Sequence, residues 1–450
     1  MPKKPTKKHR IHFIGIGGIG ISALARYFLV QNWLISGSDV VESIEIKELR
    51  KEGIKVKIGH KKSNIRPNLN LVVYSQAIPA DNSEFLEAKR LGIPLKSYPE
   101  ALGSLTRRYK TIAIAGSHGK STTTALTALV FMAAGLDPTV IVGTKLEEFG
   151  GKNFRLGKSD YLIIEADEYK DSFLNYYPES IIVTNVDREH LDHYKNFRNV
   201  KKGFLKFINN LAPNGVLILN KDDKPLSSLT IKNKKVTWFS LKDVKHVKQI
   251  KKILKIPGAH NLSNALGVFK LAKSFGIKEN TVLKALAKYR GAWRRMEYKG
   301  KLKGVEMKTL VFDDYAHHPT EIKATLKAFR EKFPKSLLMC VFQPHQSRRL
   351  KILFKEFTGA FDEADVLILL NIFKVSGRDE LSHNVNSEKL AKTILKRKNG
   401  PKGLIYLPSP EALRKTLIEL LQTKNHRLKT AVMVMMGAGD IVNLTPKLLN

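Results

Sequence analysis

Short apolar runs rich in β-branched residues alternate along the chain with longer segments whose apolar residues recur at helical spacing. Short strands separated by helices are typical of a parallel α/β sheet, because parallel strands need a crossover helix between them. We therefore predict an α/β fold. The expected strands are residues 12–16, 33–36, 55–58, 71–74, 111–115, 161–165, 181–185, 216–220, 308–313, 336–342, 366–372 and 431–436. Helices are expected at residues 21–30 and from Thr124 onwards.

These strands fall into three sets. A polar stretch at residues 106–110 follows the first set, and a charged, glycine-flanked stretch at residues 292–304 follows the second. Domain joints usually lie in such exposed polar segments. We therefore predict three domains, at residues 1–105, 106–295 and 296–450.

Composition excludes several classes of protein. Hydrophobic residues make up 43% of the 450 residues, yet no apolar stretch approaches the roughly 20 residues that a membrane-spanning helix requires. The basic amino terminus precedes a run that glycines interrupt, so we expect no cleavable signal. Cys340 is the only cysteine, which excludes a disulfide framework and a thiolate metal cage. We expect a cytoplasmic protein that does not insert into a membrane.

The net charge of +37 makes nucleic acid an obvious candidate partner. The lysines, however, are spread over every segment, and aromatic residues seldom alternate with them. We therefore expect no nucleic-acid partner. The charge predicts attraction for small polyanionic substrates instead.

A first glycine loop follows the first expected strand and precedes a helix. Its glycines are Gly15, Gly17, Gly18 and Gly20. In this context the backbone approaches a diphosphate closely, and the helix amino terminus supplies amide donors. Asp39 follows the second expected strand, where a ribose-binding acid usually lies. NAD, a UDP-sugar and a tight turn without a ligand all remain compatible with this loop.

A second phosphate loop follows the expected strand at residues 111–115. It runs through Gly116, Ser117, His118, Gly119, Lys120, Ser121 and Thr122. Ile114 stands where a usual P-loop has its first glycine, but successive amides can still surround phosphate oxygens. Lys120 is suited to the β- and γ-phosphates, and the Ser121 hydroxyl to Mg²⁺. Two phosphate loops argue against a simple dehydrogenase, which has no use for a γ-phosphate lysine.

Acidic residues and a histidine follow the next two expected strands. Glu165 ends one strand and begins a cluster of carboxylates at residues 165–168, whereas His190 follows the other strand. Parallel strands bring their carboxyl ends to one edge of a sheet, so we expect these side chains near the loop at Gly116. Carboxylates and imidazole there are candidate ligands of two cations.

Together these motifs resemble those of the Mur ligase family of peptidoglycan synthesis. The similarity runs nearly from end to end, and so many motifs in this order are highly specific. The further matching segments are residues 36–39, 260–264, 291–295, 313–321, 343–345 and 437–440.

The resemblance implies a Rossmann-like domain for a UDP-sugar, a central P-loop ATPase-like domain and a Rossmann-like carboxy-terminal domain for an amino acid. It also implies a reaction in two steps. The lactyl carboxylate of UDP-N-acetylmuramate attacks the γ-phosphate of ATP, and the amine of L-alanine then displaces phosphate from the acyl phosphate. The implied cofactors are ATP and two Mg²⁺ ions. The implied partners are these small-molecule substrates, and the oligomeric state stays open.

The resemblance also implies roles for individual residues. The UDP-sugar would contact the first glycine loop, Ser38, Asp39 and Ser75. The implied ATP-binding residues are Gly116, Ser117, His118, Gly119, Lys120, Ser121, Thr122, Asn261, Asn264, Arg294, Arg295 and Asp314. The implied metal ligands are Ser121, Glu165 and His190. Tyr315, His345 and Arg349 would line the amino-acid site.

The implied catalytic residues are Lys120, His190, Arg295, His317 and His318. Arg294 or Arg295 would reach the γ-phosphate when the domains close. Structural roles stay open for several of these positions. Asp313 and Asp314 are also typical of a strand-end cap, His317 and His318 of a loop held by backbone hydrogen bonds, and Arg294 of a surface pair with Glu297.

Two features depart from the family pattern. Gln346 stands where the pattern has an arginine that contacts the amino acid's carboxylate, and Tyr169 is typical of the related ligase that recycles a murein tripeptide. Because of Gln346, the choice of L-alanine over serine or glycine is less firmly implied than the reaction class, and because of Tyr169, tripeptide ligation to the same sugar is the alternative activity. Two more distant alternatives are an NAD-dependent oxidoreductase, motivated by the first glycine loop, and a nucleic-acid-dependent ATPase, motivated by the charge.

Overall fold

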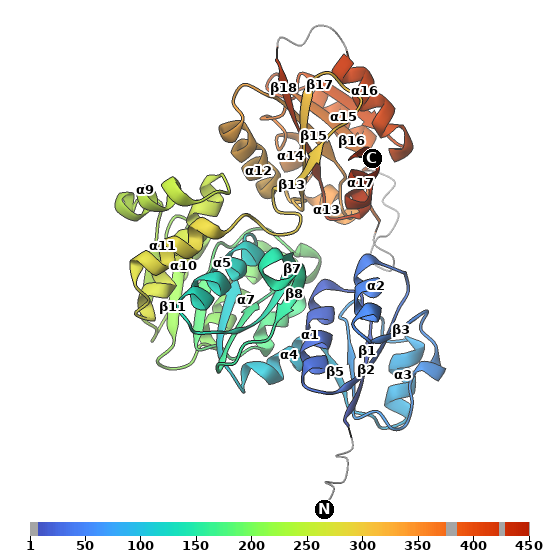
Figure 1. The fold of residues 1–450 in the computed structure, drawn as a ribbon, viewed down its shortest axis with the longest axis vertical. Helices are drawn as coiled ribbons and strands as arrows, with labels where there is room; N and C mark the ends of the chain where they lie inside the picture. Colours follow the sequence, from blue (N-terminus) through green and yellow to red (C-terminus); the bar gives the residue numbers. More distant parts are fainter. Residues whose placement is uncertain (1–7, 375–384, 423–427, 450) are drawn as a thin grey trace, which may run out of the picture. The chain divides into compact units, whose positions relative to one another are not determined.

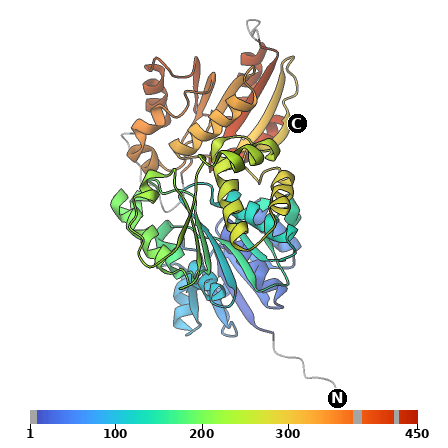
Figure 2. The ribbon, with the colours of Figure 1, turned by 90° about the vertical axis from the view of Figure 1, so that its left-hand side faces the viewer.

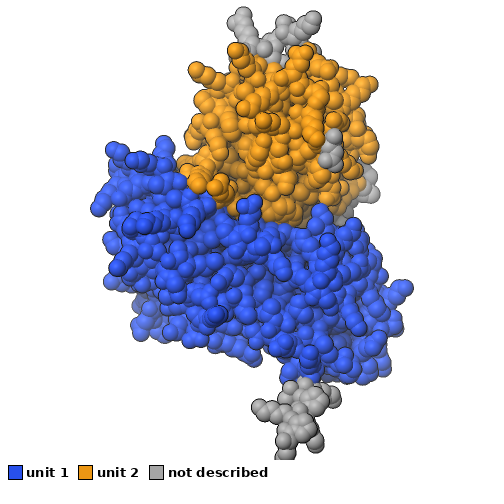
Figure 3. Space-filling view, in the orientation of Figure 1, with its two compact units in different colours: residues 1–253, 263–289 blue, residues 254–262, 290–450 orange. Residues whose placement is uncertain are grey.

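The computed structural model describes residues 8–374, 385–422 and 428–449. In these residues the strands form three sheets (Figure 1). The chain divides into two compact units (Figure 3), unit 1 with Met1–Ile253 and Ser263–Tyr289, and unit 2 with Leu254–Leu262 and Arg290–Asn450. Unit 1 holds the first two sheets and unit 2 holds the third. No helix in the described ranges is long and apolar enough to cross a membrane.

The first sheet is parallel and has the strand order β3-β2-β1-β4-β5. Its strands are β1 (Arg10–Ile14), β2 (Leu34–Asp39), β3 (Lys55–Ile58), β4 (Leu71–Tyr74) and β5 (Leu95–Ser97). Its helices are α1 (Ile19–Val30), α2 (Ile44–Lys51), α3 (Ser83–Arg90) and α4 (Tyr98–Thr106), with a 3-10 turn at Lys62–Asn64. Strand β1 ends two residues before the expected position 16, because Gly15 turns the chain with a φ of +78°.

The second sheet has the order β12-β11-β10-β6-β9-β7-β8 and is parallel except for the β7–β8 pair. Its strands are β6 (Lys110–Ala115), β7 (Thr139–Leu146), β8 (Lys152–Arg155), β9 (Tyr161–Glu165), β10 (Ser180–Val183), β11 (Val216–Asn220) and β12 (Val236–Phe239). Its helices are α5 (Lys120–Ala133), α6 (Leu191–Tyr194), α7 (Phe197–Asn209), α8 (Lys224–Ser227), α9 (Val244–Ile253), α10 (Ala259–Ser274) and α11 (Glu279–Lys288), with 3-10 turns at Glu147–Phe149 and Tyr169–Asn175. In Figure 2, α7 lies on one face of this sheet, whereas α5 and α11 lie on the other.

Helix α5 begins at Lys120 and not at the expected Thr124. The threonine run at 122–124 is β-branched and therefore a poor local helix signal. Thr122, Thr123 and Thr124 are nevertheless buried, so packing of the first turn extends the helix to the end of the loop. The correction places Lys120 and Ser121 in that first turn.

The third sheet has the order β13-β14-β18-β15-β16-β17 and is parallel except for the β13–β14 pair. Its strands are β13 (Glu297–Lys301), β14 (Lys308–Asp314), β15 (Leu337–Phe342), β16 (Val366–Leu370), β17 (Gly403–Leu407) and β18 (Thr430–Met436). Its helices are α12 (Pro319–Lys332), α13 (Ser347–Ile352), α14 (Phe354–Thr358), α15 (Ser387–Leu395), α16 (Leu413–Gln422) and α17 (Leu444–Leu449), with 3-10 turns at Pro410–Ala412 and Asp440–Asn443.

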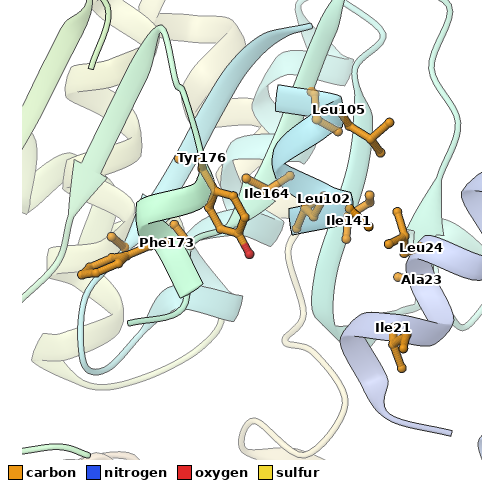
Figure 4. Close-up of a cluster of buried hydrophobic side chains, with 14 of the residues drawn as sticks. Ile21, Ala23, Leu24, Leu102, Leu105, Ile141, Ile164, Phe173 and Tyr176 are labelled. Carbon is orange, nitrogen blue, oxygen red and sulfur yellow. The ribbon is translucent and has the colours of Figure 1, made fainter. Parts of the chain in front are cut away.

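One hydrophobic cluster joins the two sheets of unit 1. Figure 4 shows Ile21, Ala23 and Leu24 of α1 beside Leu102 of α4 and Ile141 of β7. Helix α1 also contacts β7 and β8 directly. The helix that follows the first glycine loop is therefore buried between the two sheets, and its position depends on both.

Candidate active site

The first glycine loop rests on the end of β2. The amides of Gly15 and Ile16 donate to the carbonyl oxygen of Ser38 at 2.8 and 3.0 Å, and the amide of Gly17 donates to Oδ2 of Asp39 at 2.8 Å. Asp39 therefore shapes the loop itself in this structure. A Cβ on Gly15 would lie 3.0 Å from Cβ of Ser75, which places Ser75 beside the loop.

Two residues that are expected to contact the sugar make contacts with other parts of the protein in this structure. The Ser38 hydroxyl donates to Oε2 of Glu84 at 2.5 Å. Gly20 lies in α1, where a Cβ would stand 2.9 Å from the Tyr98 hydroxyl. Its missing side chain therefore permits close packing of α1 on α4. Gly18 immediately precedes α1 and has an extended conformation.

The second loop lies between β6 and α5, with β9 and β10 as the neighbours of β6. The His118 amide donates to Oδ1 of Asn185 at 2.9 Å, and its Nε2 lies 2.9 Å from Oδ2 of Asp187. The Asp187 amide in turn donates to the Ser117 hydroxyl at 2.9 Å. Residues that follow β10 thus hold the loop in place.

Glycine is required at both ends of this loop. Gly116 has a φ of +136°, and a Cβ there would overlap Oγ1 of Thr184 at 2.0 Å. Gly119 has a φ of +83°, and a Cβ there would lie 2.8 Å from Oδ1 of Asn264. Asn264, expected to contact the adenine, is therefore adjacent to the loop. Asn261 also lies in α10, where its amide donates to the Pro257 carbonyl at 2.7 Å.

The Lys120 ammonium is held by oxygens at the edge of the sheet. Nζ lies 2.7 Å from the Gly116 carbonyl oxygen, 2.8 Å from Oε2 of Glu168 and 3.6 Å from Oδ1 of Asp167. Burial opposes the positive charge, but the two carboxylates outweigh burial and raise the pKa of Lys120. Lys120 is therefore a cation at neutral pH, as contact with phosphate requires.

Candidate metal ligands converge next to this lysine. One oxygen from each of Asp167 and Glu168 and one imidazole nitrogen of His190 lie within 4.8 Å of one another. Oxygen and imidazole donors suit a divalent cation, so the donor set fits Mg²⁺. The structure thus groups His190 with Asp167 and Glu168, and not with Glu165, the carboxylate that the resemblance implies as a ligand. The signal for Asp167 and Glu168 in the sequence was the acidic run at residues 165–168.

The other two expected ligands lie in neighbouring elements. Glu165 ends β9, and its Oε2 fills the space beside Gly143, where a Cβ would come within 2.6 Å. Ser121 is in the first turn of α5 and is 4% exposed. Neither belongs to the group formed by Asp167, Glu168 and His190.

In unit 2 the expected amino-acid residues gather after β14 and β15. The rings of Tyr315 and His317 lie 5.3 Å apart, and those of His317 and His345 lie 5.9 Å apart. Nη1 of Arg349 lies 3.3 Å from Nδ1 of His345. Gln346, the departure from the family pattern, has a φ of +67°.

Some of these residues have the structural roles that the sequence left open. His318 caps α12 by accepting from the Thr320 amide, and Nδ1 of His317 lies 3.0 Å from the Tyr315 carbonyl oxygen. Asp314 accepts from the amides of Ala316 and Met296 at 2.9 and 2.8 Å. These three side chains therefore stabilise the loop that precedes α12.

The two arginines at the expected domain joint differ. The Arg294 guanidinium is 5% exposed and donates to the carbonyl oxygens of Gly437 and Gly439. Its backbone amide, and not its guanidinium, contacts Glu297. The Arg295 guanidinium lies 5.0 Å from the centre of the Tyr315 ring, beside the expected amino-acid residues.

Comparison with known proteins covers almost the whole chain. Three family models match in order: the Mur ligase family, catalytic domain at residues 10–110, the Mur ligase middle domain at 114–272, and the Mur ligase, glutamate ligase domain at 294–448. The protein from Acetivibrio thermocellus named UDP-N-acetylmuramate–L-alanine ligase is 37% identical, over 97% of this chain and 95% of its own length. The protein of the same name from Clostridium kluyveri is 38% identical, over 99% and 98%.

Solved structures agree with this result. The crystal structure of UDP-N-acetylmuramate-alanine ligase from Thermotoga maritima superposes with a TM-score of 0.79 at 25% identity, over 98% of each chain. A murein peptide ligase from Psychrobacter arcticus has the same fold, with a TM-score of 0.70 at 22% identity. With three matching family models and full-length relatives above the level at which homology is secure, the chain belongs to the Mur ligase family.

Proposed function

We propose that the protein joins L-alanine to the lactyl carboxylate of UDP-N-acetylmuramate at the expense of ATP. One observation carries the proposal: a lysine-bearing phosphate loop and a carboxylate–imidazole cluster share one sheet edge, in a chain whose full-length relatives bear the name of that ligase. This activity is the first peptide step of peptidoglycan precursor synthesis. We also propose a cytoplasmic location, since Cys340 is a buried free thiol.

We assign the substrates to the three sheets. Residues 1–105 take the UDP-sugar, residues 106–295 take ATP and residues 296–450 take the amino acid. The glycine loop after β1 supports the first assignment, and the loop from Gly116 to Thr122 supports the second. The cluster of Tyr315, His345 and Arg349 supports the third.

The reaction brings anions together, and the protein's cations lower that barrier. A lactyl carboxylate oxygen attacks the γ-phosphorus of ATP, ADP leaves, and an acyl phosphate results. Lys120 exchanges its contact with Glu168 for phosphate oxygens and so stabilises the charge that develops there. Arg295 is the arginine that we assign to the γ-phosphate, because Arg294 already donates to two backbone carbonyls.

The second step forms the amide bond. The L-alanine amine attacks the acyl carbon, the tetrahedral intermediate collapses, and inorganic phosphate leaves with the bonding electron pair. We assign the proton of the amine to His317 and His345, whose rings lie 5.9 Å apart. Mg²⁺ at Asp167, Glu168 and His190, with a second ion near Ser121 and Glu165, would supply charge neutralisation on the phosphates.

Phosphate release tests the proposal. Purified protein would be given ATP, Mg²⁺ and UDP-N-acetylmuramate, with L-alanine, glycine, L-serine or the murein tripeptide as acceptor. We expect release that requires both the sugar and L-alanine. Release that requires the tripeptide would instead support the recycling activity, which Tyr169 favours, whereas release with glycine or L-serine would reflect Gln346. NADH titration and stimulation by DNA or RNA serve as controls for the two distant alternatives.

A further inference from the structure

A buried carboxylate lies beneath the first glycine loop. Glu84, in the first turn of α3, has no exposed surface. Its carboxylate accepts from the Ser38 hydroxyl at 2.5 Å, from the Lys61 amide at 3.2 Å and from the side-chain amide of Asn64. Nδ1 of His60 lies 3.3 Å from Oε2. One side chain thus connects α3, the end of β2 and the segment after β3.

The network is built for a negative charge. Burial favours the neutral acid, but the hydrogen bonds from His12, His60, Ser38 and Asn64 outweigh burial and hold the pKa of Glu84 well below its usual range. The amino terminus of α3, which Asn82 caps, adds a favourable dipole. A buried charge is costly for a fold that only needs to pack a helix, because an apolar side chain would serve that purpose.

Ser38 links this carboxylate to the loop. Its hydroxyl contacts Glu84, and its carbonyl oxygen accepts both the Gly15 and the Ile16 amide. The next residue, Asp39, accepts the Gly17 amide. The amides of Gly15, Ile16 and Gly17 therefore all donate to Ser38 or Asp39, two consecutive residues of β2. Glu84 in turn holds Ser38.

We propose that Glu84 is a positioning residue for the UDP-sugar: by fixing Ser38, which holds the Gly15 and Ile16 amides, it sets the course of the loop and so the direction of the amides at the start of α1 that receive the diphosphate. This inference rests on the proposed function, which assigns the loop to UDP-N-acetylmuramate. Glu84 acts through Ser38 and need not touch the substrate. Its effect belongs to sugar binding and not to the chemical steps, which take place at the second loop.

Replacement of one oxygen tests this role. Glu84→Gln keeps the shape but removes the negative charge. The Lys61 and Asn64 donors keep the glutamine oxygen at the Oε1 position, so its NH₂ group faces Ser38 and a weaker neutral contact replaces the charge-assisted one. We expect the KM for UDP-N-acetylmuramate to rise about tenfold, while kcat and the KM values for ATP and L-alanine stay within about twofold. Calorimetric titration with UDP-N-acetylmuramate should show the same loss. Glu87→Gln, on the same helix, is the matched control because Glu87 pairs with Arg90 at the surface.

Ser38→Ala decides the question if Glu84→Gln folds poorly, because it removes only the hydroxyl. It should raise the same KM, and the effect of the double variant should be smaller than the sum of the two single effects, since both changes break the contact between Ser38 and Glu84. The Ser38 hydroxyl also lies 3.0 Å from Nδ1 of His60, so Ser38→Ala removes that contact as well. An unchanged sugar KM in Ser38→Ala, or equal loss for all three substrates in either variant, would overturn the inference. Absence of ligase activity in the unmodified protein would instead refute the proposed function.

Discussion

The Lys120 ammonium has carboxylate and carbonyl oxygens as its neighbours in the structure, and phosphate oxygens would replace them during the reaction. The lysine is therefore oriented before ATP arrives, and the carboxylates that hold it keep it charged. A single side chain thus couples the phosphate loop to the acidic segment after β9.

Lys120→Ala should lower phosphate release by roughly a thousandfold, because it removes the cation that stabilises the developing charge. UDP-N-acetylmuramate binding, measured by calorimetry, should change less than about threefold, since the first glycine loop, proposed to bind the sugar, belongs to another sheet. Lys47→Ala, at an exposed position of α2, is the control. Comparable loss of sugar binding and turnover would contradict the separation of the two sites.

Asp313 provides a pH-dependent contribution to stability. It is 2% exposed, and burial raises its pKa from 3.8 to about 6. The folded state therefore keeps a proton that the unfolded chain releases between these values. The stabilisation from this group is complete below about pH 4 and is lost as the pH rises through 6.

Asp313→Asn should remove this dependence and retain an acceptor for the Thr445 hydroxyl. Relative to the unmodified protein, the variant should gain about 1 to 3 kcal/mol in free energy of unfolding between pH 4 and pH 7. Urea unfolding at both pH values measures the difference. Asp362→Asn, which alters a surface pair with Arg397, should show no such gain. If the difference in free energy of unfolding between Asp313→Asn and the unmodified protein is the same at both pH values, Asp313 does not cause the pH dependence.

At the scale of elements, the start of α5 defines the second phosphate loop. The helix begins directly after Gly119, whose positive φ turns the chain into it. The loop amides, Lys120 and Ser121 thereby share one helix amino terminus, which favours anions.

Gly119→Ala should raise the KM for ATP at least tenfold, because a Cβ adds a strained φ and a clash with Asn264. Gly135→Ala is the matched control: Gly135 has a φ of +77°, but nothing lies within 4 Å of its Cβ position. Each variant should lose about 1 to 2 kcal/mol of stability, measured by urea unfolding. Only Gly119→Ala should raise the KM for ATP. A similar rise in the ATP KM for both variants would show that the clash with Asn264 is not the cause.

At the scale of the whole molecule, a buried ionic network joins the two sheets of unit 1. Arg26 of α1 is 2% exposed and pairs with Glu45 at 2.5 Å and Glu52 at 2.9 Å. It also donates to the side-chain oxygen of Asn153 in β8, whose amide nitrogen contacts the Ile19 carbonyl and the Ser22 hydroxyl. The helix after the first glycine loop is thus attached to the sheet that carries the second loop.

Arg26→Met should lower the free energy of unfolding by about 3 to 5 kcal/mol, because it leaves buried carboxylates without their main partner. The joint at residues 106–110 should become more sensitive to limited proteolysis. Arg90→Met, which disturbs an exposed pair with Glu87, should cost less than about 1 kcal/mol. Equal stability of the two variants would show that the hydrophobic cluster alone holds the sheets together.

Local patterns were sufficient for several strands. The expected strands at residues 55–58, 71–74, 161–165 and 216–220 have the predicted bounds. In the last three an apolar run between polar turns is a signal within the segment itself. The described strands that were not expected are β5, β7, β8, β12, β13 and β17. The sequences of β5, β8 and β13, LKS, KNFR and EYKGK, contain no apolar run, and hydrogen bonds to a neighbouring strand make them strands. The sequences of β7, β12 and β17, TVIVGTKL, VTWF and GLIYL, do contain apolar runs, and that signal was missed.

The sequence by itself determined the α/β class, the two glycine loops between a strand and a helix, and the family, since each is written in consecutive residues or in the order of short motifs. Only the tertiary structure decided that Glu84 holds Ser38, that Arg26 reaches Asn153 and that Arg294 donates to backbone carbonyls. These partners are far apart in the chain, and a buried charge takes whichever partner folding brings within hydrogen-bonding distance. Sequence patterns specify what a segment can form, whereas packing of distant segments specifies what each polar side chain contacts.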